Sequence, residues 1–190
     1  LVGSSENKFT YELNEGTKSG NYNITTEVGT LTVKNREKAY EITVVANSDT
    51  EKYDGTEKSV SGFETLTFEV EGNTYTVEGL SASAKGTDAG EYPAEVTGTA
   101  VVKDADGNDV TGQFAVKTKD GKLEIEKREV TLTSGSATKE YDGEPLTNDT
   151  VTVSGDGFAE GEGATYTVTG SQTVVGWSDN EFTYELNEGT

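Results

Sequence analysis

Hydrophobic and polar residues alternate one by one along much of the chain, which predicts β-strands with one buried face and one exposed face. The alternation is clearest in residues 40–44, 66–70, 75–77, 123–125, 130–133, 151–153 and 182–186. Threonine fills many of the polar positions, as is typical of the exposed face of a pleated sheet. Because no stretch of ten or more residues has a helical period, we expect an all-β protein.

Composition and charge exclude several classes of function. Only 31% of the residues are hydrophobic and the net charge is -20, a combination typical of disorder that the regular alternation argues against. The chain has no Cys and no His, which excludes disulfides, zinc or haem sites built on these residues, and catalysis by an imidazole or a thiolate. The negative charge repels nucleic acid, and no run approaches the ~18 apolar residues of a membrane span.

The chain contains one long repeat. Residues 1–17 and 174–190 are identical at 13 of 17 positions and both contain the sequence FTYELNEGT. A repeat of this length and fidelity indicates a parent protein in which the unit recurs. The chain does not begin with Met, and we expect it to be an excised fragment of that parent.

A second, weaker repeat lies within the first. The turn sequence Tyr53-Asp54-Gly55 recurs 88 residues later as Tyr141-Asp142-Gly143, and residues 21–33 resemble residues 113–125. We therefore predict that residues 38–127 form a complete module, that 1–37 hold the last strands of a truncated one, and that 128–190 begin another. An open sheet edge leaves backbone groups unpaired, so we expect residues 18–37 to complete module 128–190, in cis or in trans.

The spacing of strands and turns within residues 38–127 favours an immunoglobulin-like β-sandwich. Hairpin turns are predicted at Asp106-Gly107 and Asp120-Gly121, because glycine accepts the positive φ of such turns. The segment Asp88-Ala89-Gly90-Glu91-Tyr92 has the form of a tyrosine corner, in which a Tyr hydroxyl bonds back to a nearby loop. A β-grasp-like module is the alternative, and it needs a helix that the sequence does not indicate.

Several segments together resemble the MBG/YDG-type repeats of large bacterial cell-surface proteins. These segments are residues 137–147, 169–176, 20–24 and 29–33, with a divergent copy of the closing element at 109–114. The resemblance implies an extracellular, adhesin-like protein in which such modules act as spacers, and it brings no catalytic residues. Residues 84–90 depart from the family pattern, so the resemblance says little about the loops of the middle module.

The densest group of acids comprises Asp104, Asp106, Asn108 and Asp109. Alternating oxygen ligands suit Ca²⁺, but Gly107 falls at the fourth position of the loop instead of the sixth position that an EF-hand requires. The competing interpretation is a hairpin turn with solvated acids, and the spacing favours it. Apart from this calcium candidate we expect no cofactor.

Two aromatic features allow a structural or a binding interpretation. Tyr53 and Tyr141 would either stack on a ligand or pack beside a tight turn, in which the Asp bonds locally and the Gly adopts positive φ; turn chemistry favours packing. Trp177, the only Trp, is replaced by Ser4 in the other copy, so we expect it outside the core, where it would contact a partner or pack within a loop.

These patterns favour a non-catalytic spacer, and no pair of acids suggests a glycosidase cleft. The expected partners are neighbouring repeats of the same protein. The alternative is a module that binds a host glycan or host protein through loops 154–163 and 171–180. The former loop is glycine-rich and acidic, and we interpret it as a flexible surface loop.

Overall fold

The computed structural model describes residues 2–189 and is all-β, as the alternation predicts. Sixteen strands form seven small sheets, and the helical content of residues 2–189 is limited to two single 3-10 turns, η1 (Ser19–Asn21) and η2 (Thr111–Gln113). The β-grasp alternative would need an α-helix, and this part of the chain forms none. No helix there is long and apolar enough to cross a membrane.

The chain divides into two compact units, each described separately. Unit 1 comprises residues 1–45, 63–81 and 97–119, and unit 2 comprises 46–62, 82–96 and 120–190. Each unit thus takes part of the predicted module 38–127, and the boundaries predicted at 37/38 and 127/128 stay predictions.

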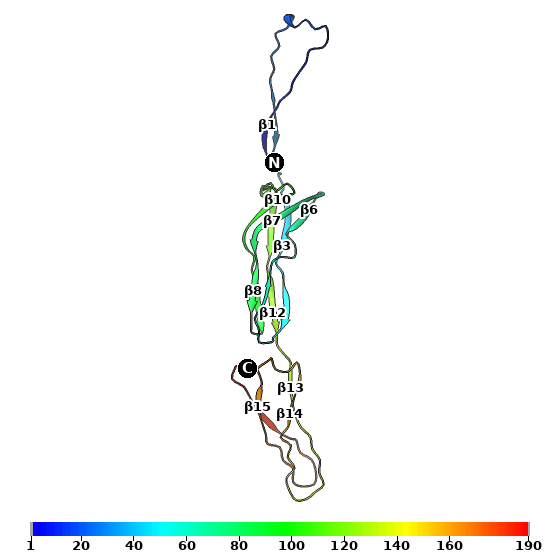
Figure 1. Ribbon diagram of the computed structural model, residues 1–190, viewed down its shortest axis with the longest axis vertical. Helices are drawn as coiled ribbons and strands as arrows, with labels where there is room; N and C mark the ends of the chain where they lie inside the picture. The colour runs from blue at the N-terminus through cyan, green and yellow to red at the C-terminus, as the bar shows by residue number, and fades with distance from the viewer. Residues whose placement is uncertain (1, 190) are drawn as a thin grey trace. The chain divides into compact units, whose positions relative to one another are not determined.

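Unit 1 contains two sheets around one core (Figure 1). The first sheet has the order β10 (Thr97–Asp104), β7 (Asn73–Ser81), β6 (Thr67–Val70), and the second pairs β11 (Phe114–Lys119) in parallel with β3 (Tyr40–Val45). Their facing side chains form the buried cluster Ile42, Val44, Val77, Val102 and Phe114. Burying such side chains is the main stabilising contribution, about 1.5–3 kcal/mol each.

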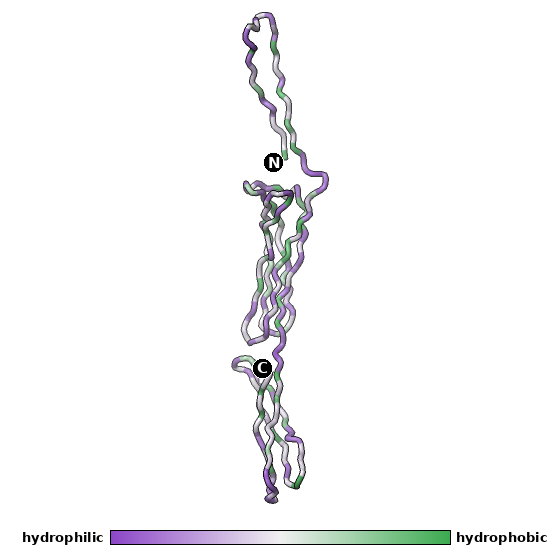
Figure 2. The backbone as a smooth tube through the Cα atoms, turned by 90° about the vertical axis from the view of Figure 1, so that its right-hand side faces the viewer, coloured by the Kyte–Doolittle hydropathy of each residue, from purple (hydrophilic) through white to green (hydrophobic). Residues whose placement is uncertain are grey.

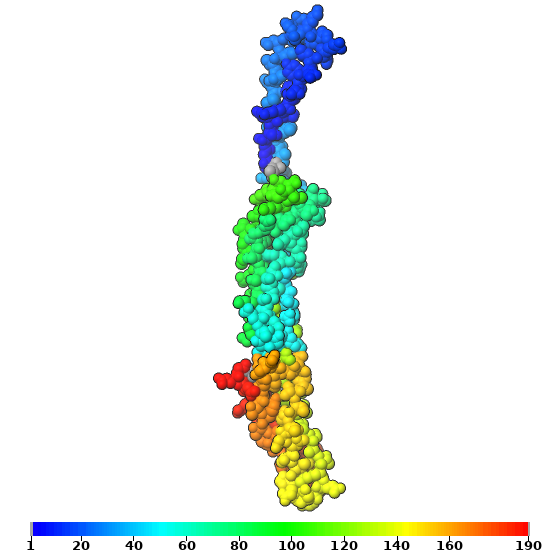
Figure 3. Space-filling view, viewed as in Figure 1, coloured from blue at the N-terminus to red at the C-terminus, as the bar shows by residue number. Residues whose placement is uncertain are grey.

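The first residues of unit 1 form a ribbon without a covering sheet. Strand β1 (Gly3–Asn7) pairs antiparallel with β2 (Gly29–Val33), and every described residue from Val2 to Lys38 is exposed. Figure 2 shows hydrophobic residues recurring along both arms of this ribbon, and Figure 3 shows it as a thin strip of chain. Two strands alone are marginally stable in water.

Unit 2 repeats the sandwich arrangement with other strands. One sheet has the order β4 (Asp49–Lys52), β12 (Gly121–Glu126), β9 (Gly90–Ala94), and it faces the pair β5 (Lys58–Ser61) and β8 (Ser83–Gly86). Their core contains the buried residues Ala84, Ala94, Leu123 and Ile125. The rest of the unit holds two antiparallel pairs, β13 (Val130–Ser134) with β14 (Val151–Gly155) and β15 (Ala164–Val168) with β16 (Phe182–Leu186).

The hairpin predicted at Asp120-Gly121 is wrong. Strand β12 pairs in parallel with β4 and antiparallel with β9, and the offset between parallel partners is 74 residues, as it is for β11 and β3 (Leu123 opposite Asp49, Phe114 opposite Tyr40). Glycine is required at 121 for a different reason, since a Cβ there would lie 2.0 Å from the carbonyl oxygen of Asn47. The Asp-Gly sequence, which usually indicates a turn, here reflects a close approach of two backbone segments.

The predicted tyrosine corner is confirmed at the level of its hydrogen bond. The hydroxyl of Tyr92 donates to the carbonyl oxygen of Asp88 at 2.9 Å. The ring of Tyr92 covers Gly86, where a Cβ would lie 2.3 Å from the ring. This bond ties the start of β9 to the loop before it.

Candidate functional site

The turn Tyr53-Asp54-Gly55 has the predicted local chemistry. The Asp54 carboxylate accepts hydrogen bonds from the backbone N–H and the hydroxyl of Thr56, and it pairs with the ammonium of Lys58. These contacts, the Lys58 hydrogen bond first, hold the pKa of Asp54 well below its usual range. Gly55 has φ +80°, which L-residues rarely adopt.

The second copy of this turn has the same backbone design. Asp142 accepts from the backbone N–H of Glu144 and from Lys139, as Asp54 does from Thr56 and Lys58, and Gly143 has φ +84°. These interactions, the Lys139 bond first, lower the pKa of Asp142. The tyrosines differ, since Tyr141 is 69% exposed whereas Tyr53 packs against the unit 2 core.

Tyr53 is held by a residue 109 positions away. Its hydroxyl donates a hydrogen bond to the Glu162 carboxylate. That bond, with a smaller contribution from burial, raises the pKa of Tyr53. Beside it, Ala159 is only 5% exposed and lies against Gly55. The turn at 53–55 is therefore packed against residues 159–162, as the packing interpretation requires.

Arg128 also connects the turn at 53–55 to the loop that contains Glu162. Its guanidinium donates to the carbonyl oxygens of Tyr53 (3.2 Å), Gly157 (2.7 Å) and Asp156. Three acceptors from two chain segments use the fixed fork geometry of arginine, which a lysine cannot reproduce. We call this arrangement of Tyr53, Arg128, Asp156, Gly157 and Glu162 the joint.

The Asp156 carboxylate completes the joint. It pairs with Lys52 at 2.8 Å and accepts the backbone N–H of Glu129 at 2.9 Å. Lys52 contributes most to lowering the pKa of Asp156. The interpretation of residues 154–163 as a flexible surface loop is thus wrong, because Asp156, Gly157, Ala159 and Glu162 all contact other segments.

Sequence reasoning missed Arg128 and Glu162 as functional residues. A signal for Glu162 exists, since Glu71-Gly72-Asn73-Thr74-Tyr75-Thr76-Val77 recurs as Glu162-Gly163-Ala164-Thr165-Tyr166-Thr167-Val168. At its earlier position the glutamate also accepts a tyrosine hydroxyl, from Tyr40 to Glu71 at 2.6 Å. A hydrogen bond from a tyrosine hydroxyl to a glutamate at this repeat position therefore occurs twice in the chain.

The carboxylates of Asp104 and Asp109 accept hydrogen bonds from residues of the same turn. Asp104 accepts the backbone N–H groups of Asp106 and Asn108 and the Asn108 side-chain amide, while Asp109 accepts from Thr111. These hydrogen bonds, led by those from Asn108 and Thr111, lower the pKa of Asp104 and of Asp109. Gly107 has φ +81° and its N–H bonds to the Asp104 carbonyl, so the predicted turn is present. Across residues 2–189, no three acidic side chains are placed to hold a metal ion.

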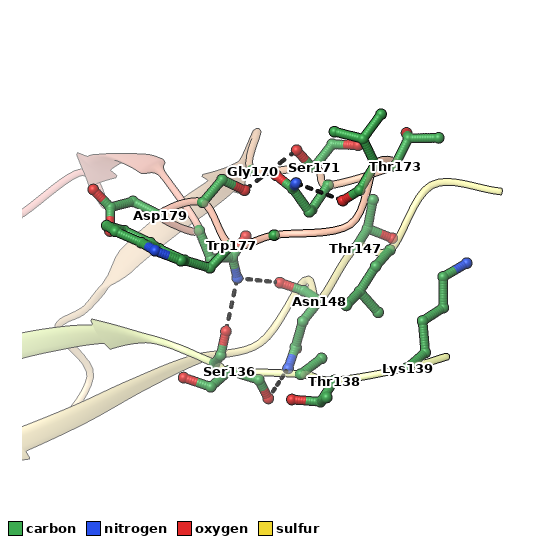
Figure 4. A pocket seen from close by; sticks show the side chains of 18 of the residues that line it. Ser136, Thr138, Lys139, Thr147, Asn148, Gly170, Ser171, Thr173, Trp177 and Asp179 are labelled. Atoms are coloured by element: carbon green, nitrogen blue, oxygen red, sulfur yellow. Dashed lines mark hydrogen bonds between the residues drawn. The ribbon is translucent and has the colours of Figure 1, made fainter. Parts of the chain in front are cut away.

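A cavity of about 570 Å³ lies between residues 134–141 and 170–180 of unit 2, within the usual ~300–1,000 Å³ of ligand sites (Figure 4). Asn148 donates to the carbonyl oxygen of Ser136, and Asn180 donates to those of Gly135 and Asn148, so side-chain amides connect the walls. Trp177, on the same wall segment as Asp179, lines the cavity and is 84% exposed, outside any core as expected.

Comparison with protein-family models finds no match to this chain, and comparisons with curated proteins and with solved structures find none either. The chemistry of the joint and of the cavity is therefore the basis for assigning a function.

Proposed function

We propose that the chain is a non-catalytic spacer of a bacterial surface adhesin, built from tandem immunoglobulin-like β-sandwich modules that project a binding region from the cell. The resemblance to MBG/YDG-type repeats motivates the extracellular placement, and the internal repeats motivate the boundaries at 38–127 and 128–190. The tyrosine corner of Tyr92 and two facing sheets in each unit support the immunoglobulin-like assignment.

The joint is the observation that carries the proposal. A spacer must resist bending where one module meets the next, and flexible linkers are typically rich in Gly and Ser. Here the connection is Lys127-Arg128-Glu129, and Arg128 bonds to the turn of the earlier module and to the loop of the later one. The high negative charge of the chain would keep neighbouring stalks apart.

Distance measurements across the joint test the spacer function. Spin labels on Lys85→Cys and Asp149→Cys are unique, because the chain has no other Cys. We expect a narrow distance distribution that Arg128→Ala broadens, with Arg128→Lys intermediate because it keeps the charge and loses the fork. Lys139→Ala, which removes an ion pair outside the joint, is the matched control and should leave the distribution unchanged. A broad distribution in the parent chain would refute the rigid spacer.

A second candidate function is adhesion to a host glycan or host protein. The exposure of Trp177 at the cavity favours it, since aromatic side chains are enriched at binding hot spots. Saturable binding on a glycan array or to a host protein, lost on Trp177→Ala, would establish adhesion. Binding that is unaffected by this substitution would place the contact elsewhere.

A further inference from the structure

We propose that the cavity between residues 134–141 and 170–180 is a slot for a β-strand, and that its occupant is residues 29–33 of a second copy of this chain. The inference goes beyond the spacer function and does not depend on it. It rests on two strand pairs that the structure contains and on the internal repeats that relate them to the cavity walls.

The first pair is β4 with β12. Leu123 and Ile125 of β12 are 0% and 2% exposed, and residues 123–126 pair in parallel with Asp49–Lys52. The repeat makes Gly29-Thr30-Leu31-Thr32-Val33 the counterpart of Gly121-Lys122-Leu123-Glu124-Ile125. Yet Leu31 and Val33 are 56% and 59% exposed. Residues 29–33 thus have the alternating pattern of a buried core strand, but their apolar side chains are exposed.

The repeat of the Tyr-Asp-Gly turn places the counterpart of β4 at residues 137–140. These residues line the cavity and belong to no strand. Within the described part of the chain their backbone N–H and C=O groups enter no β-ladder. One wall of the cavity is therefore backbone outside any sheet, at the position where β4 receives β12.

The second pair is β1 with β2, in which Gly3–Asn7 pairs antiparallel with Gly29–Val33. The long repeat makes Gly3-Ser4-Ser5-Glu6-Asn7 the counterpart of Gly176-Trp177-Ser178-Asp179-Asn180. Residues 176–180 form part of the opposite wall of the cavity. For each wall, the structure thus contains an equivalent segment that is already paired with a strand. In one case that strand is residues 29–33, and in the other it is their counterpart, β12.

The two pairs fix the register of the docked strand. In the parallel pair, Leu123 lies opposite Asp49, so its counterpart Leu31 should lie opposite Ala137. In the antiparallel pair, Leu31 lies opposite Ser5, so it should lie opposite Ser178 in the second copy. Thr32 then lies opposite Thr138. Gly29 falls between Gly135 and Asn180, so docking replaces the hydrogen bond from the Asn180 amide to the Gly135 carbonyl oxygen. On docking, strand β2 leaves β1 and pairs instead with residues 176–180 of the second copy, which are the counterpart of β1. This exchange costs little free energy, because the β1–β2 ribbon buries no side chain.

The apolar groups on both sides give the association its driving force. The cavity is lined by Tyr141, Val174, Val175 and Trp177, each at least 69% exposed, and the incoming strand brings Leu31 and Val33. Each copy has one such strand, in unit 1, and one such slot, in unit 2. The contact is therefore heterologous, and repeated association gives rings or open chains of copies.

Cysteine cross-linking of the full chain tests the register. One copy carries Thr32→Cys and the other carries Thr138→Cys, and under mild oxidation we expect a disulfide-linked heterodimer. Thr26→Cys, six residues and about 20 Å further along an extended strand, is the matched control and should react with Thr138→Cys at least about tenfold more slowly. Equal rates would overturn the proposal. A chain with both cysteines that cross-links only within itself would also overturn it.

Sedimentation velocity tests the energetics. We expect concentration-dependent association that Leu31→Asp abolishes and Leu31→Ala weakens at least about 30-fold, the effect of losing one buried leucine. Leu31 is exposed in the single chain, so neither change should unfold it. Val28→Asp is the control, because the middle module has Asp120 at the corresponding position. A chain that stays monomeric at all concentrations, or association that Leu31→Asp leaves intact, would refute the slot.

Discussion

The hydroxyl of Tyr53 donates a hydrogen bond to the carboxylate of Glu162, across 109 residues of sequence. Tyr141, the counterpart of Tyr53, is exposed and serves as an internal control. We expect Tyr53→Phe to lower the thermal midpoint by about 2–4 °C, the effect of one net hydrogen bond in a chain of this size. Tyr141→Phe should change it by less than about 1 °C. Equal shifts measured by calorimetry would argue against a role for the hydroxyl in the joint.

The stability supplied by Asp156 should depend on pH. Folding lowers its pKa, so its charged form stabilises the folded state above the ordinary value of ~3.9, and this stabilisation is lost as the pH falls through the lowered pKa. Asp156→Asn removes the charge at every pH. We therefore expect the variant to be less stable than the parent chain at pH 6, with a difference that shrinks steadily below about pH 4. Urea denaturation between pH 2 and pH 7 measures it, and a difference independent of pH would contradict the assignment.

Gly121 should tolerate no side chain. A Cβ at this position would meet the Asn47 carbonyl oxygen at 2.0 Å, and backbone atoms yield little. Gly121→Ala is expected to destabilise the protein by at least about 2 kcal/mol in chemical denaturation, as overpacking does. Gly112→Ala, whose nearest neighbour would be Asn35 at 3.9 Å, is the matched control and should stay within about 0.5 kcal/mol of the parent chain.

Two leucines at equivalent repeat positions should differ in their contribution to folding. Leu123 is fully buried in the unit 2 core, whereas Leu31 is exposed in the single chain. We expect Leu123→Ala to cost about 3 kcal/mol of unfolding free energy, and Leu31→Ala to cost less than about 0.5 kcal/mol at dilutions where the chain is monomeric. Similar losses would mean that residues 29–33 are already buried in the single chain.

The alternation of residues finds strands that carry apolar residues at every second position and cannot find strands that have none. The alternating segments 40–44 and 123–125 lie within strands β3 (Tyr40–Val45) and β12 (Gly121–Glu126). Strand β4 reads Asp-Thr-Glu-Lys and has no apolar residue, so only its parallel pairing with β12 makes it a strand. Such tertiary control of strand formation leaves no local pattern.

The candidate sites are predictable where they depend on local sequence and not where they depend on tertiary packing. The local chemistry of both Tyr-Asp-Gly turns is predictable, because an Asp that bonds to the residue two positions on is a property of short sequence. The contact of Tyr53 with Glu162 is not, since it depends on how two distant segments pack. The cavity wall at 137–140 has no apolar alternation of its own, and only the repeat of the Tyr-Asp-Gly turn relates it to β4.

The parallel pairing of the strands that open and close residues 38–127 has a mechanical consequence. Tension applied along the chain pulls β3 toward its amino end and β11 toward its carboxyl end, and the same holds for β4 and β12. Parallel neighbours pulled this way slide past each other, so the hydrogen bonds of each ladder bear the load together instead of breaking one after another. The first and last strands thus form a shear clamp, which would let the proposed spacer resist extension.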